Sequence, residues 1–220
     1  RAADVGCDHG FVPIFLVESG ISPLAVAADV RPGPLSRAKE HIKEHRLEEK
    51  IQTRLSDGLA NIKPGEADSL IMSGIGGILM MRLLQDEEHT AKSFKELILS
   101  PQSELFDVRR YLVSNGYLIE YEHMLCDEGK YYFIFHVLVK KDEREWSEEE
   151  YRYGKDICKD DMRTFLAYLE KEERQYEQIL EKMKQAPEND RAAQRIAQLH
   201  QDITCLKKRR QLVYDCGCFA

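Results

Sequence analysis

The stretch Ala2-Ala3-Asp4-Val5-Gly6-Cys7-Asp8-His9-Gly10-Phe11-Val12-Pro13 opens the chain and decides its fold class. An apolar strand at 2–5 runs into a glycine-bearing loop and then into the start of a helix. α/β enzymes use this arrangement to bring a nucleotide-like cofactor against bare backbone at a helix N-terminus. A second apolar strand at 24–29 ends in Asp29, about 20 residues after the loop, where an acid suits the two hydroxyls of a ribose.

The same loop indicates the kind of cofactor. It lacks the G-x-G-x-x-G pattern, because Asp8 stands where the middle glycine would let the backbone approach a pyrophosphate. A carboxylate there repels a diphosphate but tolerates an ammonium or a sulfonium group. The loop therefore argues against a dinucleotide and favours S-adenosylmethionine, whose methionine part carries both cations. The alternative is an ordinary turn between a strand and a helix.

Composition limits the partners of the chain. It has 220 residues, a hydrophobic content of 43% and a net charge of −7. The length suffices for one substantial domain and a smaller one, and the negative charge excludes a general polyanion binder. Any contact with nucleic acid must then use a local basic patch. The densest patch is Lys207-Lys208-Arg209-Arg210, and the others comprise Lys39, Lys43, Arg46, Arg109 and Arg110.

Cysteine usage and hydropathy indicate the compartment. Six scattered cysteines form no C-x-x-C pair, and the chain has neither a secretory signal nor an apolar run of membrane length. We therefore expect reduced thiols in a cytoplasmic protein without membrane contact. Cys216-Gly217-Cys218 alone is a poor zinc site, so we expect no metal. Because the chain opens at Arg1 directly on a strand, we expect that a further segment precedes it in the full protein.

The first two thirds of the chain alternate between strands and helices. We expect strands at 2–5, 24–29, 51–55, 69–73 and 97–100, and helices at 12–19, 34–45, 77–85 and 104–114. Two extended runs, 117–124 and 131–139, follow and are joined by Asp127-Glu128-Gly129-Lys130, which predicts a hairpin. Five strands with crossover helices and then an antiparallel edge pair are the layout of a class I methyltransferase. We predict such a Rossmann-like α/β domain over 1–145.

The last third predicts a second domain. Residues 140–150 are a charged linker, and from about Tyr151 the pattern is helical to the end, with apolar residues three and four apart. Pro187-Glu188-Asn189-Asp190 separates two helices, and Asn189 or Asp190 can cap the second. The short break makes the two helices antiparallel neighbours. We therefore predict a coiled-coil-like helical hairpin as a domain over 146–220.

Further candidate site residues follow the third, fourth and fifth strands. Asp57-Gly58 is placed where an acid can accept a hydrogen bond from an adenine amino group. Ser73-Gly74-Ile75-Gly76-Gly77 lies at the carboxyl edge, where open α/β sheets bind ligands. Its glycines permit close approach to the backbone, and without a Pro-Pro-aromatic stretch it favours a ring nitrogen over an exocyclic amine. Gln102 can hydrogen-bond a base edge, although each of these segments can equally be a turn or a helix cap.

Five motifs in this order resemble the bacterial tRNA adenine N1-methyltransferase family that modifies position 22 of tRNA. They are D-V-G-C-D-H-G-F-V-P at 4–13, A-A-D-V-R-P-G-P at 27–34, S-D-G-L at 56–59, M-S-G-I-G-G at 72–77 and L-S-P-Q at 99–102. The resemblance runs through the predicted catalytic domain, and the helical hairpin also fits the family. It implies S-adenosylmethionine as cofactor, tRNA as partner, and N1 of an adenine in the D-arm region as the methyl acceptor.

The candidate site combines the residues that the resemblance implies, which are Asp4, Gly6, Asp8, His9, Asp29, Asp57 and the turn at 73–77, with neighbours such as Gln102 that the sequence alone suggests. The candidate cofactor-binding residues are Asp4, Gly6, Cys7, Asp8, His9, Asp29, Val30, Asp57, Gly58, Ser73, Gly74 and Gly76. The candidate catalytic residues are Asp8, His9, Ser73, Gly74 and Gln102. We expect tRNA contacts from Lys207–Arg210 and from basic residues near the cofactor cleft, and no obligate protein partner. Two alternatives stay open: a methyltransferase for another base or a small molecule, and a non-catalytic module whose hairpin binds a protein.

Overall fold

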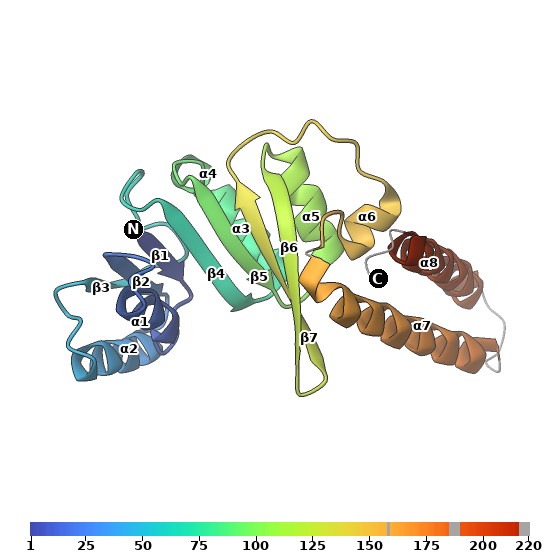
Figure 1. Ribbon diagram of the computed structural model, residues 1–220, viewed down its shortest axis with the longest axis horizontal. Helices are drawn as coiled ribbons and strands as arrows, with labels where there is room; N and C mark the ends of the chain where they lie inside the picture. The colour runs from blue at the N-terminus through green and yellow to red at the C-terminus, as the bar shows by residue number, and fades with distance from the viewer. Residues whose placement is uncertain (158, 185–189, 216–220) are drawn as a thin grey trace. The chain divides into compact units, whose positions relative to one another are not determined.

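The computed structural model describes residues 1–157, 159–184 and 190–215 (Figure 1). The chain divides into two compact units. The first unit comprises residues 1–122 and 132–143, and the second comprises residues 123–131 and the chain from Arg144 onward. The second unit therefore takes the tip of a β-hairpin whose strands begin and end in the first.

A seven-stranded sheet forms the centre of the first unit. Its strands are β1 (Ala2–Val5), β2 (Ala25–Asp29), β3 (Ile51–Leu55), β4 (Ser69–Ile75), β5 (Glu96–Pro101), β6 (Leu118–Asp127) and β7 (Lys130–Leu138). The order is β3-β2-β1-β4-β5-β7-β6; β1 to β5 are parallel, and β7 runs antiparallel to β5. This confirms the predicted strands and the predicted Rossmann-like methyltransferase layout.

The strand order creates the place for a ligand. β1 pairs with β2 on one side and with β4 on the other, so the chain turns outward in opposite directions from this central strand. At such a switch point the loops beyond the strands diverge and leave a crevice at the carboxyl ends. β1 and β2 are buried along their whole length, which explains why both read as continuous apolar runs in the sequence.

Five helices cover this sheet in two groups. They are α1 (Phe11–Glu18), α2 (Pro32–Glu44), α3 (Gly77–Asp86), α4 (Glu88–Ala91) and α5 (Leu105–Ser114). α1 and α2 contact each other and strands β2 and β3, whereas α3 contacts α4 and α5. The four predicted helices are confirmed within two residues at each end. α2 begins at Pro32 rather than Pro34, because a proline is favourable in the first helical turn. The single turn α4 was not predicted.

The second unit is helical, but its first part differs from the prediction. A short helix, α6 (Glu148–Tyr153), begins at the capping box of Ser147 and Glu150 and ends at Gly154, whose φ of 88° a helix does not allow. A 3-10 turn at Lys159–Asp161 leads into α7 (Met162–Lys184). The prediction of a continuous helical pattern from about Tyr151 was therefore wrong at Gly154, which ends α6 before the first long helix begins. α8 (Asp190–Asp215) is the second long helix, and Asn189 lies outside the described residues.

The two long helices pack along an apolar seam. Leu180, Leu199 and Ile203 form its buried core, with Tyr176, Met183 and Ile196 against it. Residues late in α7 pair with residues early in α8, so the two helices are antiparallel neighbours, as Figure 1 shows. The seam has the three- and four-residue spacing that the sequence predicted for this hairpin.

Two of the basic patches have partners inside the fold. Arg109 is fully buried and forms a bidentate pair with the equally buried Glu122, so its assignment to a surface patch was wrong. In α8, Arg210 pairs with Glu173 and Lys208 with Glu149, and Arg209 donates to the carbonyl oxygen of Lys155. Much of the charge at 207–210 therefore serves contacts between helices.

Two properties of the described residues concern membranes and metal ions. Within the described ranges, no helix is both long enough and apolar enough to cross a membrane. The same residues contain no group of three or more histidine, cysteine, aspartate or glutamate side chains that could hold a metal ion. Cys216 and Cys218 lie outside the described residues.

Candidate functional site

A cavity of about 720 Å³ opens at the carboxyl ends of β1, β2, β3 and β4. Ligand sites in proteins commonly have volumes of about 300–1,000 Å³. Of the predicted site residues, the following line it: Asp4, Gly6, Cys7, Asp8, His9, Asp29, Val30, Asp57, Gly58, Ser73 and Gly74. Residues from four separate segments of the sequence thus meet in one place, as expected for a switch point.

The loop after β1 is tightly wound. Gly6, Asp8 and Gly10 all have positive φ values, of 84°, 46° and 75°. A left-handed conformation is ordinary for the two glycines and uncommon for Asp8, although aspartate tolerates it better than most residues. Three hydrogen bonds hold the loop against β2: the N–H groups of Gly6 and Cys7 donate to the carbonyl oxygen of Ala28 at 2.9 and 3.0 Å, and the Asp8 N–H donates to Oδ2 of Asp29 at 3.1 Å.

Asp29 organises the floor of the cavity. Its side chain is 4% exposed, and its second oxygen, Oδ1, accepts a hydrogen bond from the Arg31 N–H at 2.8 Å. The Nε atom of Arg31 lies 3.7 Å from the same carboxylate. A carboxylate oxygen can accept more than one hydrogen bond, so Asp29 keeps acceptor capacity for ligand hydroxyls while it fixes the two loops.

Asp4 and Cys7 are the chemically altered groups of the cavity. Burial raises the pKa of Asp4 from 3.8 to about 7, and the negative charge of Asp29 adds to the effect. Burial also raises the pKa of the Cys7 thiol to about 12, and the neighbouring carboxylates of Asp4, Asp29 and Asp8 act in the same direction. A thiol with such a pKa is not ionised at neutral pH, so Cys7 packs in the site and does not act as a nucleophile.

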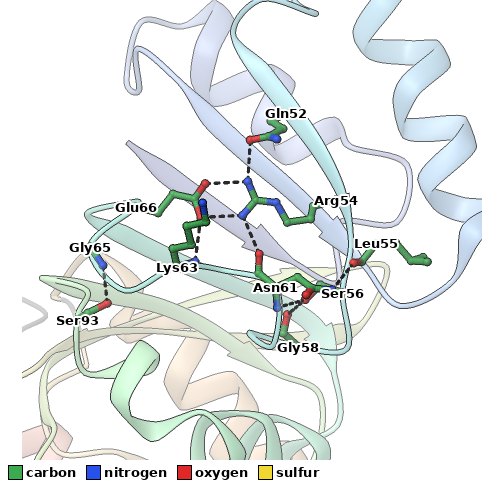
Figure 2. A network of polar contacts seen from close by, with 10 residues as sticks. All are labelled: Gln52, Arg54, Leu55, Ser56, Gly58, Asn61, Lys63, Gly65, Glu66 and Ser93. Atoms are coloured by element: carbon green, nitrogen blue, oxygen red, sulfur yellow. Dashed lines mark hydrogen bonds and ion pairs between the residues drawn. The ribbon is translucent and has the colours of Figure 1, made fainter.

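The loop after β3 presents Asp57 from a rigid support. Figure 2 shows the network: Ser56 donates through Oγ to the carbonyl oxygen of Gly58 at 2.8 Å and accepts from the Asn61 N–H. Arg54 binds both carboxylate oxygens of Glu66 at 2.7 Å and the carbonyl oxygen of Asn61 at 2.8 Å. None of these hydrogen bonds uses the carboxylate of Asp57, which is 65% exposed and lines the cavity.

Gly58 fits where a larger residue would not. Its φ is +57°, and a Cβ atom added there would lie 2.5 Å from Cδ2 of Leu83. Leu83 belongs to α3 and lines the cavity, so the absence of a side chain at position 58 lets the loop and the helix meet around the site.

The predicted turn at 73–77 lies in the cavity only in part, and it begins inside a strand. Ser73, Gly74 and Ile75 are the last residues of β4 and line the cavity, whereas Gly76 and Gln102 do not. Gly76 precedes α3, and the Gln102 N–H donates to the carbonyl oxygen of Ile75 at 2.9 Å. Gln102 therefore lies beside this segment but outside the cavity lining. Its side-chain Nε2 would lie 4.0 Å from a Cβ added at Gly74.

Several lining residues were not predicted. They include Phe11, Val12, Arg31, Leu79, Arg82 and Leu83. Arg82 lies 3.6 Å from Asp57 and 3.8 Å from Asp86, and nothing in the sequence around Asp57 indicates this arginine, because α3 brings it there. Phe11 directly follows the predicted loop and lies two residues before Pro13, the first buried residue of α1.

The chemistry of the cavity matches the ligand class that the loop predicted. Asp4, Asp8, Asp29 and Asp57 bring four carboxyl groups to its wall, which suits a cationic ligand with hydroxyl groups and opposes a pyrophosphate. Gly6 leaves bare backbone at the cavity, because the nearest atom to a Cβ added there is Cγ2 of Ile75 at 3.7 Å. Val30 and Leu83 add apolar surface for a flat ring. S-adenosylmethionine meets each of these conditions.

Comparison with known proteins agrees with this chemistry. Residues 2–208 match the family model TrmK, described as tRNA (adenine(22)-N(1))-methyltransferase. A Bacillus subtilis tRNA (adenine(22)-N(1))-methyltransferase is 26% identical over 212 residues, which cover 94% of this chain and 88% of the relative. The crystal structure of the B. subtilis tRNA m1A22 methyltransferase has a TM-score of 0.83 at 25% identity and covers 95% of this chain and 91% of that chain. A Streptococcus pneumoniae protein in complex with S-adenosyl-L-methionine has a TM-score of 0.82 at 29% identity, with coverage of 95% and 91%.

Proposed function

The chain belongs to the TrmK family of tRNA (adenine(22)-N(1))-methyltransferases, and from this premise we propose how its own residues carry the reaction. The enzyme transfers a methyl group from S-adenosylmethionine to N1 of an adenine in tRNA. The match over residues 2–208 carries this conclusion, and it decides against a small-molecule methyltransferase and a non-catalytic module.

The cofactor-binding roles follow the geometry of the cavity. Asp29 holds the ribose hydroxyls, since its carboxylate lies on the floor with acceptor capacity to spare. Asp57 accepts a hydrogen bond from the adenine amino group at the rim, and Val30 contacts the ring. Asp4 and Asp8, at the β1 end, face the ammonium of the methionine part. When bound, the cofactor supplies an electrophilic methyl group on a sulfonium.

Methylation of this acceptor atom requires no general base from the protein. Adenine N1 has an in-plane lone pair, so its methylation needs no prior loss of a proton, and the product ring is cationic. Orientation of the reactants can then supply about 7–11 kcal/mol in favourable cases. Asp8, exposed at the cavity and 3.6 Å from His9, stabilises the positive charge that develops on the base. Ser73 and Gly74 receive the base edge from the opposite side.

The second unit supplies tRNA contacts in this proposal. All four residues of the basic patch have partners within the unit, but Lys207 and Lys208 are exposed, whereas Arg209 and Arg210 are half-buried. We therefore assign phosphate contacts to the two lysines, which position the RNA without reading its sequence. At the cavity, Arg31 and Arg82 are exposed basic residues that can serve the same purpose. Because tRNA and S-adenosylmethionine occur together in the cytoplasm, we place the reaction there.

The test of the activity uses labelled S-adenosylmethionine and unmodified tRNA, with the modified nucleoside identified by mass spectrometry. The expected product is N1-methyladenosine at one position, and a tRNA with guanine at that position accepts no label. Transfer to a different base, or to a small molecule in the absence of tRNA, would contradict the proposal.

A matched pair of variants tests the role of Asp57 in cofactor binding. Arg82 lies between Asp57 and Asp86, at 3.6 and 3.8 Å, but only Asp57 lines the cavity. Asp57→Ala and Asp86→Ala each remove one of these exposed ion pairs. We expect Asp57→Ala to weaken S-adenosylmethionine binding about 10- to 100-fold, the loss of a hydrogen bond to a charged group, as measured by calorimetry. Asp86→Ala leaves the affinity unchanged. Equal effects of the two variants would overturn the role of Asp57.

A further inference from the structure

Phe11 is an aromatic residue that lines the cavity while it is 62% exposed. Exposed single apolar residues are common on protein surfaces, so exposure alone carries no meaning. Phe15, one helical turn further along α1, is 61% exposed and does not line the cavity. What distinguishes Phe11 is that its ring stands at a ligand site with its surface still uncovered.

The ring of Phe11 is held in place by its neighbours. It lies 5.9 Å from the His9 ring at an interplanar angle of 3°, and 4.9 Å from the His41 ring at 19°. His41 is itself fixed, because its Nδ1 lies 2.9 Å from the carbonyl oxygen of His9. Nη1 of Arg37 lies 3.5 Å from Nε2 of His9. Three nearly parallel rings with these anchors present Phe11 in one orientation before any ligand arrives, which lowers the entropy cost of binding.

The position of Phe11 fits the second ligand of the site and not the cofactor. The residues that suit the cofactor's adenosine, namely Asp29, Val30 and Asp57, come from β2 and from the loop after β3. Phe11 begins α1, three residues after Asp8, to which the proposed function assigns contacts with the methionine part and with the charge on the acceptor base. The segment 73–77, which the proposed function assigns to the acceptor, contains no aromatic residue. Among the described residues that line the cavity, the rings belong to His9 and Phe11.

A target adenine needs such a surface. An adenine whose N1 is to be methylated has to leave its pairing and stacking in the RNA, which costs a few kcal/mol. An aromatic side chain replaces part of the lost stacking, and its contribution is about 1–3 kcal/mol per base. We propose that Phe11, oriented by His9 and His41, is the stacking surface for the displaced target adenine. This inference rests on the proposed function and specifies which residue receives the base.

The kinetic test compares three variants after wild-type methylation of tRNA has been established. Phe11→Leu keeps the apolar volume and removes the π face, Phe11→Trp keeps a π face, and Phe15→Leu is the matched control on the same helix. We expect Phe11→Leu to lower kcat/KM for tRNA about 5- to 150-fold, the equivalent of the stacking energy, with an unchanged affinity for S-adenosylmethionine. Phe11→Trp keeps most of the activity, and Phe15→Leu behaves as wild type.

A spectroscopic test reads the stacking directly. The probe is a tRNA with 2-aminopurine in place of the target adenine, bound in the presence of S-adenosylhomocysteine so that no transfer occurs. A displaced 2-aminopurine is brighter than one stacked among the RNA bases, so the complex with Phe11→Leu, which holds less of the probe displaced, fluoresces less strongly than those of wild type and Phe15→Leu. Equal fluorescence and equal kcat/KM for Phe11→Leu and Phe15→Leu would overturn the inference. So would a loss of cofactor affinity that matches the loss of methylation, because Phe11 would then serve the cofactor. Failure of wild type to methylate tRNA would instead overturn the proposed function.

Discussion

At the residue scale, the carboxyl group of Asp4 shows how the fold changes an ordinary side chain. It is 2% exposed and lies on β1 beside Asp29 of β2, with Cys7 and Asp8 on the loop that follows. Because its pKa is raised to about 7, the folded protein binds a proton there that the unfolded chain has lost. Stability therefore falls as pH rises from about 4 through 7, and a cationic ligand displaces the proton.

The first prediction concerns Asp4→Asn, which imitates the protonated acid. The rise in the pKa of Asp4 from 3.8 to about 7 lowers the free energy of unfolding at pH 8 by up to about 4 kcal/mol. We expect the variant to be more stable than wild type at pH 8 and equal to it near pH 4, as measured by urea unfolding. We also expect weaker S-adenosylmethionine binding and the loss of proton release on binding, measured by calorimetry in two buffers. A stability difference that does not change with pH would contradict this account.

The second prediction compares two glycines with similar backbone conformations. Gly58 has a φ of +57° and meets Leu83 at 2.5 Å from an added Cβ, whereas Gly65 has a φ of +74° and nothing within 4 Å. Alanine at either position suffers the strain of a left-handed conformation, about 1–2 kcal/mol. Only Gly58→Ala also overpacks, which adds about 1–3 kcal/mol. We expect the larger loss of unfolding free energy at Gly58, together with weaker cofactor binding. Equal losses would show that Leu83 moves aside at no cost.

At the scale of elements, a buried ion pair joins α5 to β6 inside the first unit. Nη2 of Arg109 donates to Oε2 of Glu122 at 2.7 Å and its Nε donates to Oε1 at 3.0 Å. The guanidinium also lies 5.4 Å and 5.0 Å from the ring centres of Phe133 and Phe135. The pair thus connects a helix with the edge hairpin, at a position where the sequence showed only two adjacent arginines.

The third prediction tests this pair by breaking it and by replacing it. Glu122→Leu removes the carboxylate that neutralises a buried cation, so we expect a loss of about 3–5 kcal/mol in unfolding free energy. The double variant Arg109→Met with Glu122→Leu removes both charges, so we expect it to lose less unfolding free energy than the single variant. Denaturant unfolding measures both values. A double variant at least as unstable as Glu122→Leu would mean that the aromatic contacts of Arg109 dominate.

At the scale of the whole molecule, the chain carries a net charge of −7 and yet has to bind tRNA, which is a polyanion. In the second unit, acidic residues of α6 and α7 compensate much of the positive charge on α8. Lys207 shows this balance: its side chain is 52% exposed, and it lies 3.4 Å from Glu173 and 4.0 Å from Glu177. A phosphate contact there competes with the carboxylates.

The fourth prediction uses this competition, because two substitutions should act with opposite sign. Lys207→Gln removes a phosphate contact, so we expect weaker tRNA binding and a salt dependence of log K that is shallower by about one. Glu177→Gln frees the same lysine from one partner, so we expect tighter tRNA binding. Fluorescence titrations over a range of salt concentrations measure both. If the two variants change tRNA affinity in the same direction, Lys207 acts only within the protein. Cofactor affinity, which depends on the first unit, is the control.

The sequence by itself determined the strands, the long helices and the residues at the strand ends. Each of these depends on local order: apolar runs mark strands buried on both faces, and parallel strands place their C-terminal loops at one edge of the sheet. Asp8, Asp29, Asp57 and Ser73 therefore meet in the cavity as the sequence alone predicted.

Only the tertiary structure decided how distant segments act on one another. It buried Arg109 against Glu122, brought Arg82 to Asp57, kept Gln102 outside the cavity lining, and raised the pKa of Asp4. These outcomes depend on burial and on distances between elements, which no periodicity in the sequence encodes. A side chain's charge and its position along the chain are local properties, but its solvation and its partners are set by the packing around it.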